Sequence, residues 1–187
     1  MTLRVIAGAA RNRVLAAPEG HETRPTGERV REAFFSMVQT RLPGSWFLDL
    51  YAGSGAMGIE ALSRGAAHAV FVDNASKALR VLRDNLKTAG LAPLAAVHHL
   101  DAPANLSRLH RPENGYDIVF ADPPYHFEQY MELLEALGGT RLVAPDGLVA
   151  IEHTIRTEMP DRGGGFQREQ TRRYGDSAMS IYHAETD

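Results

Sequence analysis

The sequence predicts a single α/β domain built on a mostly parallel sheet, and three observations lead to this fold class. Short apolar runs alternate with amphipathic stretches from Trp46 onward, which indicates strands alternating with helices. A glycine-rich turn separates the first apolar run from the first amphipathic stretch. The length of 187 residues suffices for one buried core but not for two independent domains. Strand–helix alternation in turn implies right-handed crossovers between parallel strands.

The apolar runs and the stretches between them give the expected elements. Strands are expected in WFLDLY (46–51), AVFVD (69–73), LAAVHHLD (94–101), YDIVFAD (116–122) and GLVAIEH (147–153). Helices are expected within AMGIEALSRG (56–65), ASKALRVLRDNLKTAG (75–90), APANLSRLH (102–110) and FEQYMELLEALGG (127–139). Asn74 or Ser76 is expected to cap the second helix and Gly90 to end it. Residues 145–147, Pro-Asp-Gly, predict a turn before the last of these strands.

Further elements flank this frame on both sides. At the C-terminal end, QREQTRRYG (167–175) and SAMSIYH (177–183) predict two strands joined by a turn at residues 175–176. At the N-terminal end, LRVIAG (3–8) and RVLAAP (13–18) predict a short hairpin, followed by an amphipathic helix from about Gly27 to Thr40.

The composition excludes several kinds of chemistry. The chain has no cysteine, which rules out disulfides, thiolate zinc sites and thiolate nucleophiles. Its eight histidines show no HExxH or comparable spacing, and we expect no metal site. No apolar run approaches the roughly 18 residues that cross a bilayer, and the start MTLRVIAGAARNR has no apolar core of the secretory kind. We therefore expect a cytoplasmic protein with no membrane partner.

Basic residues gather in two segments although the net charge is −3. Residues 1–45 hold seven Arg against four Glu, a net of +3, and residues 162–175 hold four Arg against one Glu, also +3. Only two of the 20 basic residues are lysine, and arginine is the side chain that forks onto phosphates and stacks on bases. The distribution favours nucleic-acid contact at both ends, although genome base composition produces the same arginine bias.

The first candidate site is a glycine motif, Asp49-Leu-Tyr51-Ala-Gly53-Ser-Gly55-Ala-Met-Gly58. Glycines let a ligand approach the backbone at the end of the first strand, where open α/β sheets bind nucleotides. Nicotinamide-dependent enzymes share such a pattern. Here the acid Asp49 lies inside the expected strand and no basic side chain follows to meet a pyrophosphate. Both features suit a ligand with an amino-acid end and no phosphate, against the alternative of a purely structural turn.

Two further acids end the next expected strands. Asp73 stands eighteen positions after Gly55, near the spacing at which a carboxylate accepts hydrogen bonds from ribose hydroxyls. Asp101 can accept from an adenine amino group while the Ala102 N–H meets the ring. Either acid can instead cap the helix that follows it.

The strongest motif is Asp122-Pro123-Pro124-Tyr125, directly after an apolar strand. Two prolines fix φ and remove amide donors, so the backbone carbonyls stay rigid and free to accept. A carboxylate beside those carbonyls forms an acceptor-only clamp that suits a planar amino group. Tyr125 adds a face for base stacking. The alternative, a plain turn at a strand end, leaves the position of this motif relative to the glycine motif unexplained.

Together the two motifs resemble the class I amino-methyltransferases, and the flanks narrow the match. From about residue 3 to residue 183 the chain resembles the bacterial small-subunit ribosomal RNA guanine-N2 methyltransferases, the RsmD-like family. The matching segments are residues 4–8 (RVIAG), 11–13 (RNR), 24–26 (RPT), 29–32 (RVRE), 60–65 (EALSRG) and 174–177 (YGDS). Asn12 stands where glycine is usual, and both residues tolerate positive φ. The resemblance implies a Rossmann-like class I methyltransferase fold with a mostly parallel seven-stranded sheet and helices on both faces. It also implies a hairpin extension over residues 1–26 and a methyltransferase domain over residues 27–187.

The resemblance implies methyl transfer from S-adenosylmethionine to the exocyclic N2 amino group of a guanine in 16S ribosomal RNA, without a metal. The partner is ribosomal RNA or a small-subunit assembly, and a monomer is compatible with this. The implied catalytic residues are Asp122, Pro123 and Tyr125. The implied cofactor contacts are Asp49, Tyr51, Gly53, Gly55, Gly58, Asp73, Asp101 and Ala102. Seven arginines are placed to grip phosphates, although each can also be a solvated surface charge: Arg4, Arg11, Arg13, Arg24, Arg29, Arg172 and Arg173.

Other functions explain only part of the pattern. An adenine-N6 methyltransferase also uses DPPY, but it normally needs a target-recognition region for which this chain has no room. A protein-glutamine methyltransferase usually carries NPPY. A nicotinamide-dependent oxidoreductase leaves DPPY unexplained, and a non-catalytic RNA-binding module explains the arginines but neither motif.

Overall fold

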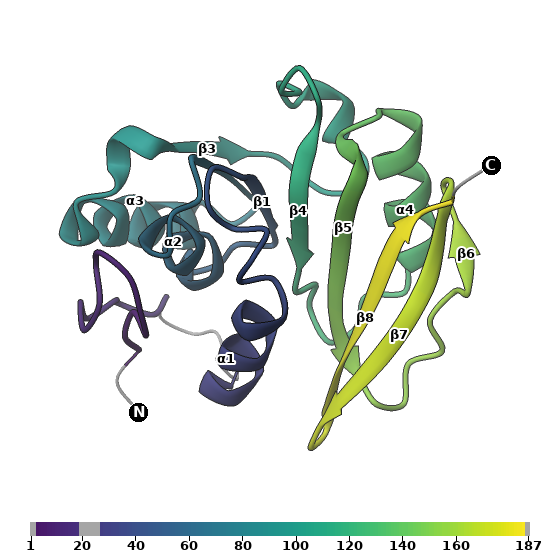
Figure 1. Cartoon of the computed structure of the whole chain (residues 1–187), viewed down its shortest axis with the longest axis horizontal. Helices are drawn as coiled ribbons and strands as arrows, with labels where there is room; N and C mark the ends of the chain where they lie inside the picture. The colour runs from purple at the N-terminus through teal and green to yellow at the C-terminus, as the bar shows by residue number, and fades with distance from the viewer. Residues whose placement is uncertain (1–2, 19–26, 186–187) are drawn as a thin grey trace.

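An eight-stranded sheet forms the centre of the computed structural model, which describes residues 3–18 and 27–185 (Figure 1). The strands lie in the order β3-β2-β1-β4-β5-β8-β7-β6. A parallel half contains β1 (Trp46–Leu50), β2 (His68–Asp73), β3 (Ala95–His99), β4 (Tyr116–Ala121) and β5 (Val143–Thr154). An antiparallel half adds β8 (Ser177–Ala184), β7 (Phe166–Tyr174) and β6 (Arg162–Gly163) to the edge formed by β5.

The predicted fold class is therefore confirmed, with one difference in strand count. The sheet has eight strands where seven were expected, because the two residues of β6 pair with Gln167 and Phe166 of β7. So short a strand, half of it glycine, carries no alternation that a sequence pattern could reveal.

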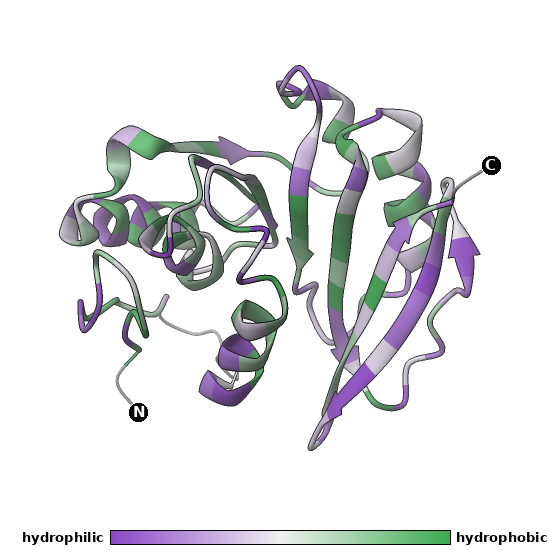
Figure 2. Cartoon of the chain, in the orientation of Figure 1, coloured by the Kyte–Doolittle hydropathy of each residue, from purple (hydrophilic) through white to green (hydrophobic). Residues whose placement is uncertain are grey.

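The helices cover both faces, as predicted, because successive side chains of each strand point to opposite faces. Phe47 of β1 packs in one core cluster with the buried side chains of α1 (Glu28–Met37), α2 (Ala56–Ser63) and α3 (Ser76–Ala89). Its neighbour Leu48 packs in the other cluster with α4 (Tyr130–Gly139). Figure 2 shows apolar residues along much of β5, in the middle of the sheet, and mainly polar residues along β7 near its edge.

Three local predictions were wrong. The stretch 102–110 forms no α-helix but only the 3₁₀ turn η2 (Leu106–Arg108); a second 3₁₀ turn, η1 (Ala92–Leu94), precedes β3. The Pro-Asp-Gly segment 145–147 does not form the predicted turn. It lies within β5, whose pairing with β4 shifts register there. Neither Asn74 nor Ser76 caps α3, whose N-cap residue is Ala75 without a side-chain hydrogen bond.

The N-terminal segment, residues 3–18, packs on α2 and α3. Its two halves meet at a single antiparallel bridge, Arg4 with Val14, so the predicted hairpin is reduced to one bridge with flanking backbone bonds. Asn12 takes φ 69°, the conformation that its place in the motif predicted. The buried carboxylate of Glu60 on α2 accepts from the backbone N–H groups of Ile6 (2.7 Å) and Ala7 (3.0 Å). The segment is thus held by specific polar contacts as well as by apolar packing.

None of the helices within residues 3–18 and 27–185 combines the length and the apolar character that crossing a bilayer requires.

Candidate active site

The candidate site lies at the carboxyl ends of β1, β2 and β4. β1 is the point at which the strand order reverses, since β2 follows it on one side and β4 on the other. Open α/β sheets bind ligands at such a switch point, outside the carboxyl ends of the strands. The glycine turn follows β1, Asp73 ends β2 and Asp122 directly follows β4. The fold therefore brings together three motifs that are up to 73 residues apart in the sequence.

The glycine turn between β1 and α2 is fastened to the end of β2. Gly53 and Gly55 take φ values of 53° and 78°, in the left-handed region that favours glycine. The Gly53 N–H donates to Oδ2 of Asp73 at 2.8 Å, and the Ala75 N–H donates to Oδ1 at 2.8 Å. Asp73 is half-buried, and each oxygen uses one of its two lone pairs in these bonds, so the carboxylate holds the turn and can still accept from a further donor.

Asp49 lies beneath this turn and not on its surface. Its side chain is 2% exposed, and Oδ2 accepts from the Gly58 N–H at 2.9 Å. Burial raises the pKa of Asp49, and the nearby carboxylates of Asp122 and Asp73 raise it further, against the lowering effect of the Gly58 bond. A side chain added at Gly58 would meet the Phe71 ring at 2.3 Å, so only glycine fits there. Both residues therefore shape the turn from below.

The loop after β3 contributes Asp101 and Ala102. The exposed Asp101 does not cap a helix, since η2 has Asn105 as N-cap; its Oδ1 accepts instead from Nδ2 of Asn74 at 3.0 Å. The Ala102 carbonyl accepts from the Tyr51 hydroxyl at 3.0 Å. Burial and the charge of Asp101 raise the pKa of Tyr51, which keeps that hydroxyl protonated as a donor. Asn74 and the Tyr51 hydroxyl thus fix this loop beside the glycine turn.

The DPPY motif forms the loop that leaves β4. Asp122 is half-buried, Pro123 is buried, and Tyr125 is 64% exposed. The Asp122 N–H lies 3.4 Å from the Leu50 carbonyl, at the end of β1. The Pro124 carbonyl accepts from the Phe127 N–H at 2.9 Å, which closes a turn. The loop therefore presents a carboxylate near the glycine turn and an aromatic ring to solvent.

Sequence reasoning missed an aromatic row behind this loop. The Phe127 ring lies 5.4 Å from the Tyr51 ring and 4.9 Å from the Tyr130 ring, with edge-to-face geometry in both pairs. Tyr130 in turn meets His153 of β5 at 6.5 Å. Phe127 was expected inside a helix, but α4 begins only at Tyr130. A long-range aromatic contact of this kind leaves no local sequence signal.

Asn85 is a second residue that the motifs did not reveal. It lies on the buried face of α3, is 3% exposed, and donates from Nδ2 to the carbonyls of Ala16 (2.9 Å) and Ser54 (2.8 Å). Its Oδ1 accepts from the Ala16 N–H at 2.8 Å. The buried amide therefore ties the N-terminal segment to the glycine turn. Its position three residues after buried Leu82 marks a polar residue on an apolar helix face, the one signal that could have found it.

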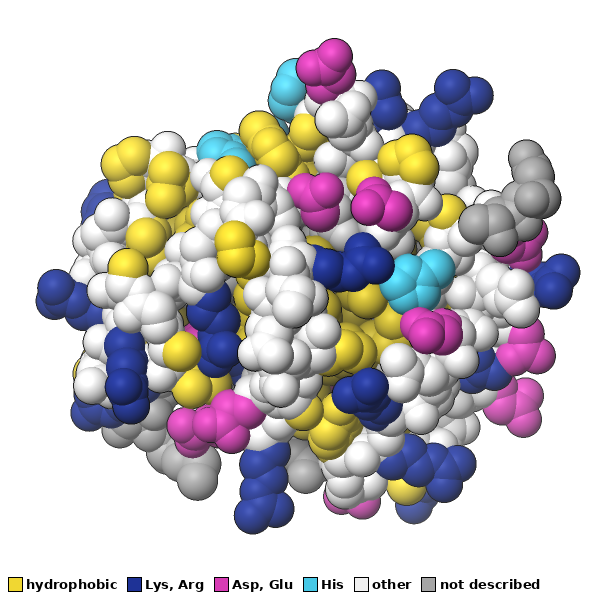
Figure 3. All heavy atoms as spheres, in the orientation of Figure 1, with side chains coloured by type: hydrophobic (Ala, Val, Ile, Leu, Met, Phe, Trp, Pro, Cys, Tyr) yellow, Lys and Arg dark blue, Asp and Glu magenta, His cyan; other side chains and the backbone are white. Residues whose placement is uncertain are grey.

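The candidate RNA-binding arginines are spread over the molecule. Arg24 lies outside the described residues, and the other six are exposed: Arg4, Arg11, Arg13, Arg29, Arg172 and Arg173. In Figure 1 the N-terminal segment and β7 lie on opposite sides of the molecule, with α1 between them. Figure 3 shows Lys and Arg side chains scattered over this face, with Asp and Glu among them, and no single continuous patch. Arg31, between Arg29 and the family's Glu32, is instead buried and donates to the Arg4 carbonyl at 2.8 Å.

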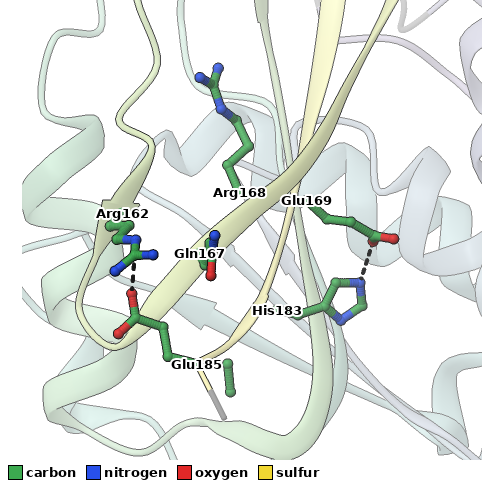
Figure 4. Close-up of a pocket in the computed structure, with 7 residues that line it drawn as sticks. Arg162, Gln167, Arg168, Glu169, His183 and Glu185 are labelled. Atoms are coloured by element: carbon green, nitrogen blue, oxygen red, sulfur yellow. Dashed lines mark ion pairs between the residues drawn. The ribbon is translucent and has the colours of Figure 1, made fainter. Parts of the chain in front are cut away.

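Two hollows lie away from this site. One, of about 420 Å³, is lined by charged residues of β6, β7 and β8 (Figure 4). Within it Glu169 lies 2.9 Å from His183 and Arg162 lies 3.7 Å from Glu185, while Arg168 pairs with Asp161 outside the lining. The other is lined by residues around Arg141 and Gly164. Among residues 3–18 and 27–185, no cluster of three or more His, Cys, Asp or Glu side chains could hold a metal ion.

Comparisons with known proteins match nearly the whole chain. The model of a family described as "Conserved hypothetical protein 95" matches residues 3–183. The "Putative rRNA methyltransferase YlbH" of Bacillus subtilis is 38% identical over 180 residues, covering 96% of this chain and 98% of that protein. The "Ribosomal RNA small subunit methyltransferase D" of Escherichia coli is 32% identical over 183 residues, covering 98% and 90%. The solved structure of "Putative methyltransferase yhhF" from Escherichia coli superposes with a TM-score of 0.82, at 30% identity, over 100% of both chains.

Proposed function

The chain belongs to the family described as Conserved hypothetical protein 95, as its motifs predicted. On this premise we propose that it methylates the N2 amino group of a guanine in small-subunit ribosomal RNA, with S-adenosylmethionine as the methyl donor. One observation carries the proposal. The glycine turn, Asp73 and the DPPY loop follow adjacent strands at one switch point of the sheet. The names of the relatives from Bacillus subtilis and Escherichia coli support ribosomal RNA as the substrate class.

The residues present fit the proposed donor. S-adenosylmethionine, when bound, supplies an electrophilic methyl group on a positively charged sulfur. The carboxylates of Asp73 and Asp122 each lie close enough to Asp49 to raise its pKa, and two acids beside the glycine turn favour a cationic ligand. Asp73 would bind the ribose of the donor, and the glycine turn would bind its amino-acid end. Asp101 and the Ala102 N–H would bind its adenine. Asp49 and Gly58 would act from beneath by shaping the turn.

Asp122 and Pro123 carry the acceptor chemistry of the proposal. The lone pair of the guanine amino group is delocalised into the ring, so this nitrogen is a poor nucleophile until its hydrogens are held. The Asp122 carboxylate and the Pro123 carbonyl are acceptors only, and they can hold both hydrogens in place. When the nitrogen gains the methyl group it loses one proton, which Asp122 receives directly or through water. Positioning supplies most of the rate in such a site.

Tyr125 and the exposed arginines serve substrate capture. A guanine must leave a stacked setting, or lie in a loop, before its amino group reaches Asp122. The Tyr125 ring, 64% exposed at the loop tip, offers a face for the displaced base. Arg4, Arg11, Arg13 and Arg29 on one side and Arg172 and Arg173 on the other would grip phosphates around it.

Methyl-labelled donor, incubated with the protein and either naked 16S ribosomal RNA or purified small subunits, tests this function. After digestion to nucleosides, label in N2-methylguanosine is the expected result. Label in N6-methyladenosine would support the adenine alternative, and label on a base carbon, on ribose oxygen or in no nucleoside would contradict the proposal.

A further inference from the structure

A row of contacts joins the two loops that the proposed function assigns to the cofactor and to the base. At one end, the Tyr51 hydroxyl donates to the Ala102 carbonyl, in the loop placed beside the adenine, at 3.0 Å. At the other end, the Tyr51 ring meets the Phe127 ring at 5.4 Å with an interplanar angle of 68°. Phe127 stands in the loop that presents Asp122 and Tyr125. One side chain therefore touches both halves of the site.

Tyr51 is held in a costly backbone conformation. Its φ of 58° lies in the left-handed region, which an aromatic residue rarely adopts. Such a conformation persists only where the surroundings fix it, and it concentrates at functional sites. Here the carbonyl before it, on Leu50, accepts from the Asp122 N–H at 3.4 Å, and the N–H after it, on Ala52, donates to Val72 at 3.0 Å. Backbone contacts to Asp122, directly after β4, and to Val72 of β2 thus set the direction in which the Tyr51 side chain points.

Residues 122–129, between β4 and α4, form the acceptor loop, which presents Asp122 and Tyr125. Tyr125 at its tip is 64% exposed, and α4 does not begin until Tyr130. Phe127 closes the loop, because its N–H donates to the Pro124 carbonyl at 2.9 Å and its ring packs between Tyr51 and Tyr130. The Tyr51 ring is therefore in direct contact with the residue that closes this loop.

We propose that Tyr51 and Phe127 couple the two binding sites, so that cofactor binding orders the acceptor loop before the base arrives. Adenine bound against residues 101–102 restrains the Ala102 carbonyl, which restrains the Tyr51 hydroxyl and, through the ring contact, Phe127. Tyr51 and Phe127 are positioning residues in this inference, which rests on the proposed function. By reciprocity, a base held in the acceptor loop must also tighten cofactor binding.

Amide hydrogen exchange with S-adenosylhomocysteine tests the coupling without any RNA. The reporter is the amide of residue 127, with those of residues 125–129 beside it. In the unaltered protein, saturating S-adenosylhomocysteine should slow their exchange by about two- to tenfold, the range that one aromatic pair contributes. Phe127→Leu should abolish this slowing, although it keeps the reporter amide. Tyr51→Phe should keep protection around residue 102 and lose it at residue 127, because only the hydroxyl link is cut.

Met131→Leu is the matched control, since Met131 lies 41% exposed on α4, next to Tyr130. It should respond like the unaltered protein, and thermal unfolding should show all variants folded. Calorimetry measures the affinity of each variant for S-adenosylhomocysteine, so that the ligand concentration can be chosen to give equal occupancy in all of them. If S-adenosylhomocysteine binds but residues 125–129 exchange as before, or if Phe127→Leu keeps the full protection, the coupling is overturned while the proposed function stands. If the ligand does not bind at all, the proposed function fails and the coupling fails with it.

Discussion

Asp73 accepts a hydrogen bond from the backbone of Gly53, with 2.8 Å between Oδ2 and the amide nitrogen, and so ties the end of β2 to the turn after β1. Its other oxygen accepts from Ala75 at the start of α3. One carboxylate thus sets the spacing of two strand ends and remains available to a ribose.

Replacing Asp73 by alanine should weaken binding of S-adenosylhomocysteine by roughly 1–3 kcal/mol, as expected for lost hydrogen bonds to a charged group. Isothermal titration calorimetry measures this directly. The control is Asp84→Ala on α3, an exposed carboxylate 3.4 Å from Lys87 Nζ, which should leave affinity unchanged. Unchanged affinity in a folded Asp73→Ala protein would contradict the assignment.

Replacing Asp122 by asparagine should lower turnover by roughly 10²–10⁴, the contribution of a positioned base. The change is nearly isosteric, but it places a donor amide against the guanine amino hydrogens and removes the proton acceptor. S-adenosylhomocysteine affinity should stay close to that of the unaltered protein, and this serves as the internal control. Single-turnover methylation of RNA measures the effect; an unchanged rate would exclude Asp122 as the acceptor.

Tyr125 should act through its ring face alone. Tyr125→Ala should raise KM for RNA by the equivalent of about 1–3 kcal/mol per stacked base, whereas Tyr125→Phe should be nearly silent. Leu94→Ala, at another exposed apolar side chain, controls for a general surface effect. Equal losses in the alanine and phenylalanine variants would instead point to the hydroxyl.

The N-terminal arginines should contribute to a salt-dependent RNA affinity. Changing Arg11 and Arg13 together to alanine should weaken RNA binding and reduce the log–log salt slope by about 0.7–0.9 for each lost phosphate contact. The paired change Arg80→Ala with Arg83→Ala, two exposed arginines of α3, removes the same charge elsewhere. If only the control pair alters the slope, another face of the protein holds the RNA.

Asp49 should make stability depend on pH. The pKa of Asp49 lies well above its ordinary value, chiefly because the carboxyl is buried. The hydrogen bond from Gly58 lowers this pKa, and the nearby carboxylates of Asp122 and Asp73 raise it. The folded protein therefore binds this proton more tightly than the unfolded chain does. Its stabilising contribution is complete below the unfolded pKa of about 4 and is lost as the pH rises toward the folded pKa.

Asp49→Asn removes the ionisation but keeps an oxygen that can accept from Gly58. The melting temperature of the variant relative to the unaltered protein should therefore rise between about pH 4 and about pH 7. Thermal unfolding at several pH values measures it. A difference that stays constant over this range would mean that Asp49 does not titrate as its burial implies.

The sequence alone predicted those parts of the fold that depend on local patterns. The alternation of apolar runs located β1, β2 and β4, and Asp73 was correctly placed at the end of β2. Residues 102–110 were wrongly expected to form a helix. A helix of nine residues is marginal without packing, and only Ala102, Leu106 and Leu109 of this stretch lie in the apolar core. The turn predicted at residues 145–147 does not form. These residues belong to β5, and the pairing of β5 with β4 changes register there.

The candidate site also has parts that the sequence could predict and parts that it could not. The glycine turn and DPPY were recognisable because each is a contiguous motif next to a strand. Phe127 and Asn85 were not, since their roles arise from partners that are 76 and 69 residues away, namely Tyr51 and Ala16. Residue 127 lies outside α4 despite a helical pattern, because its N–H closes a turn with the Pro124 carbonyl.

The three backbone groups that bond to the Asn85 side-chain amide limit how far the chain can be truncated from its N-terminus. Two of them belong to Ala16 and the third to Ser54 in the glycine turn. A fragment starting at residue 27 would lose both Ala16 bonds, each of which contributes roughly 0.5–1.5 kcal/mol net. It would also uncover the surface that Val5 and Leu15 now shield from water. The shortest fragment that preserves the geometry of the glycine turn therefore has to include the residues that wrap around α2 and α3.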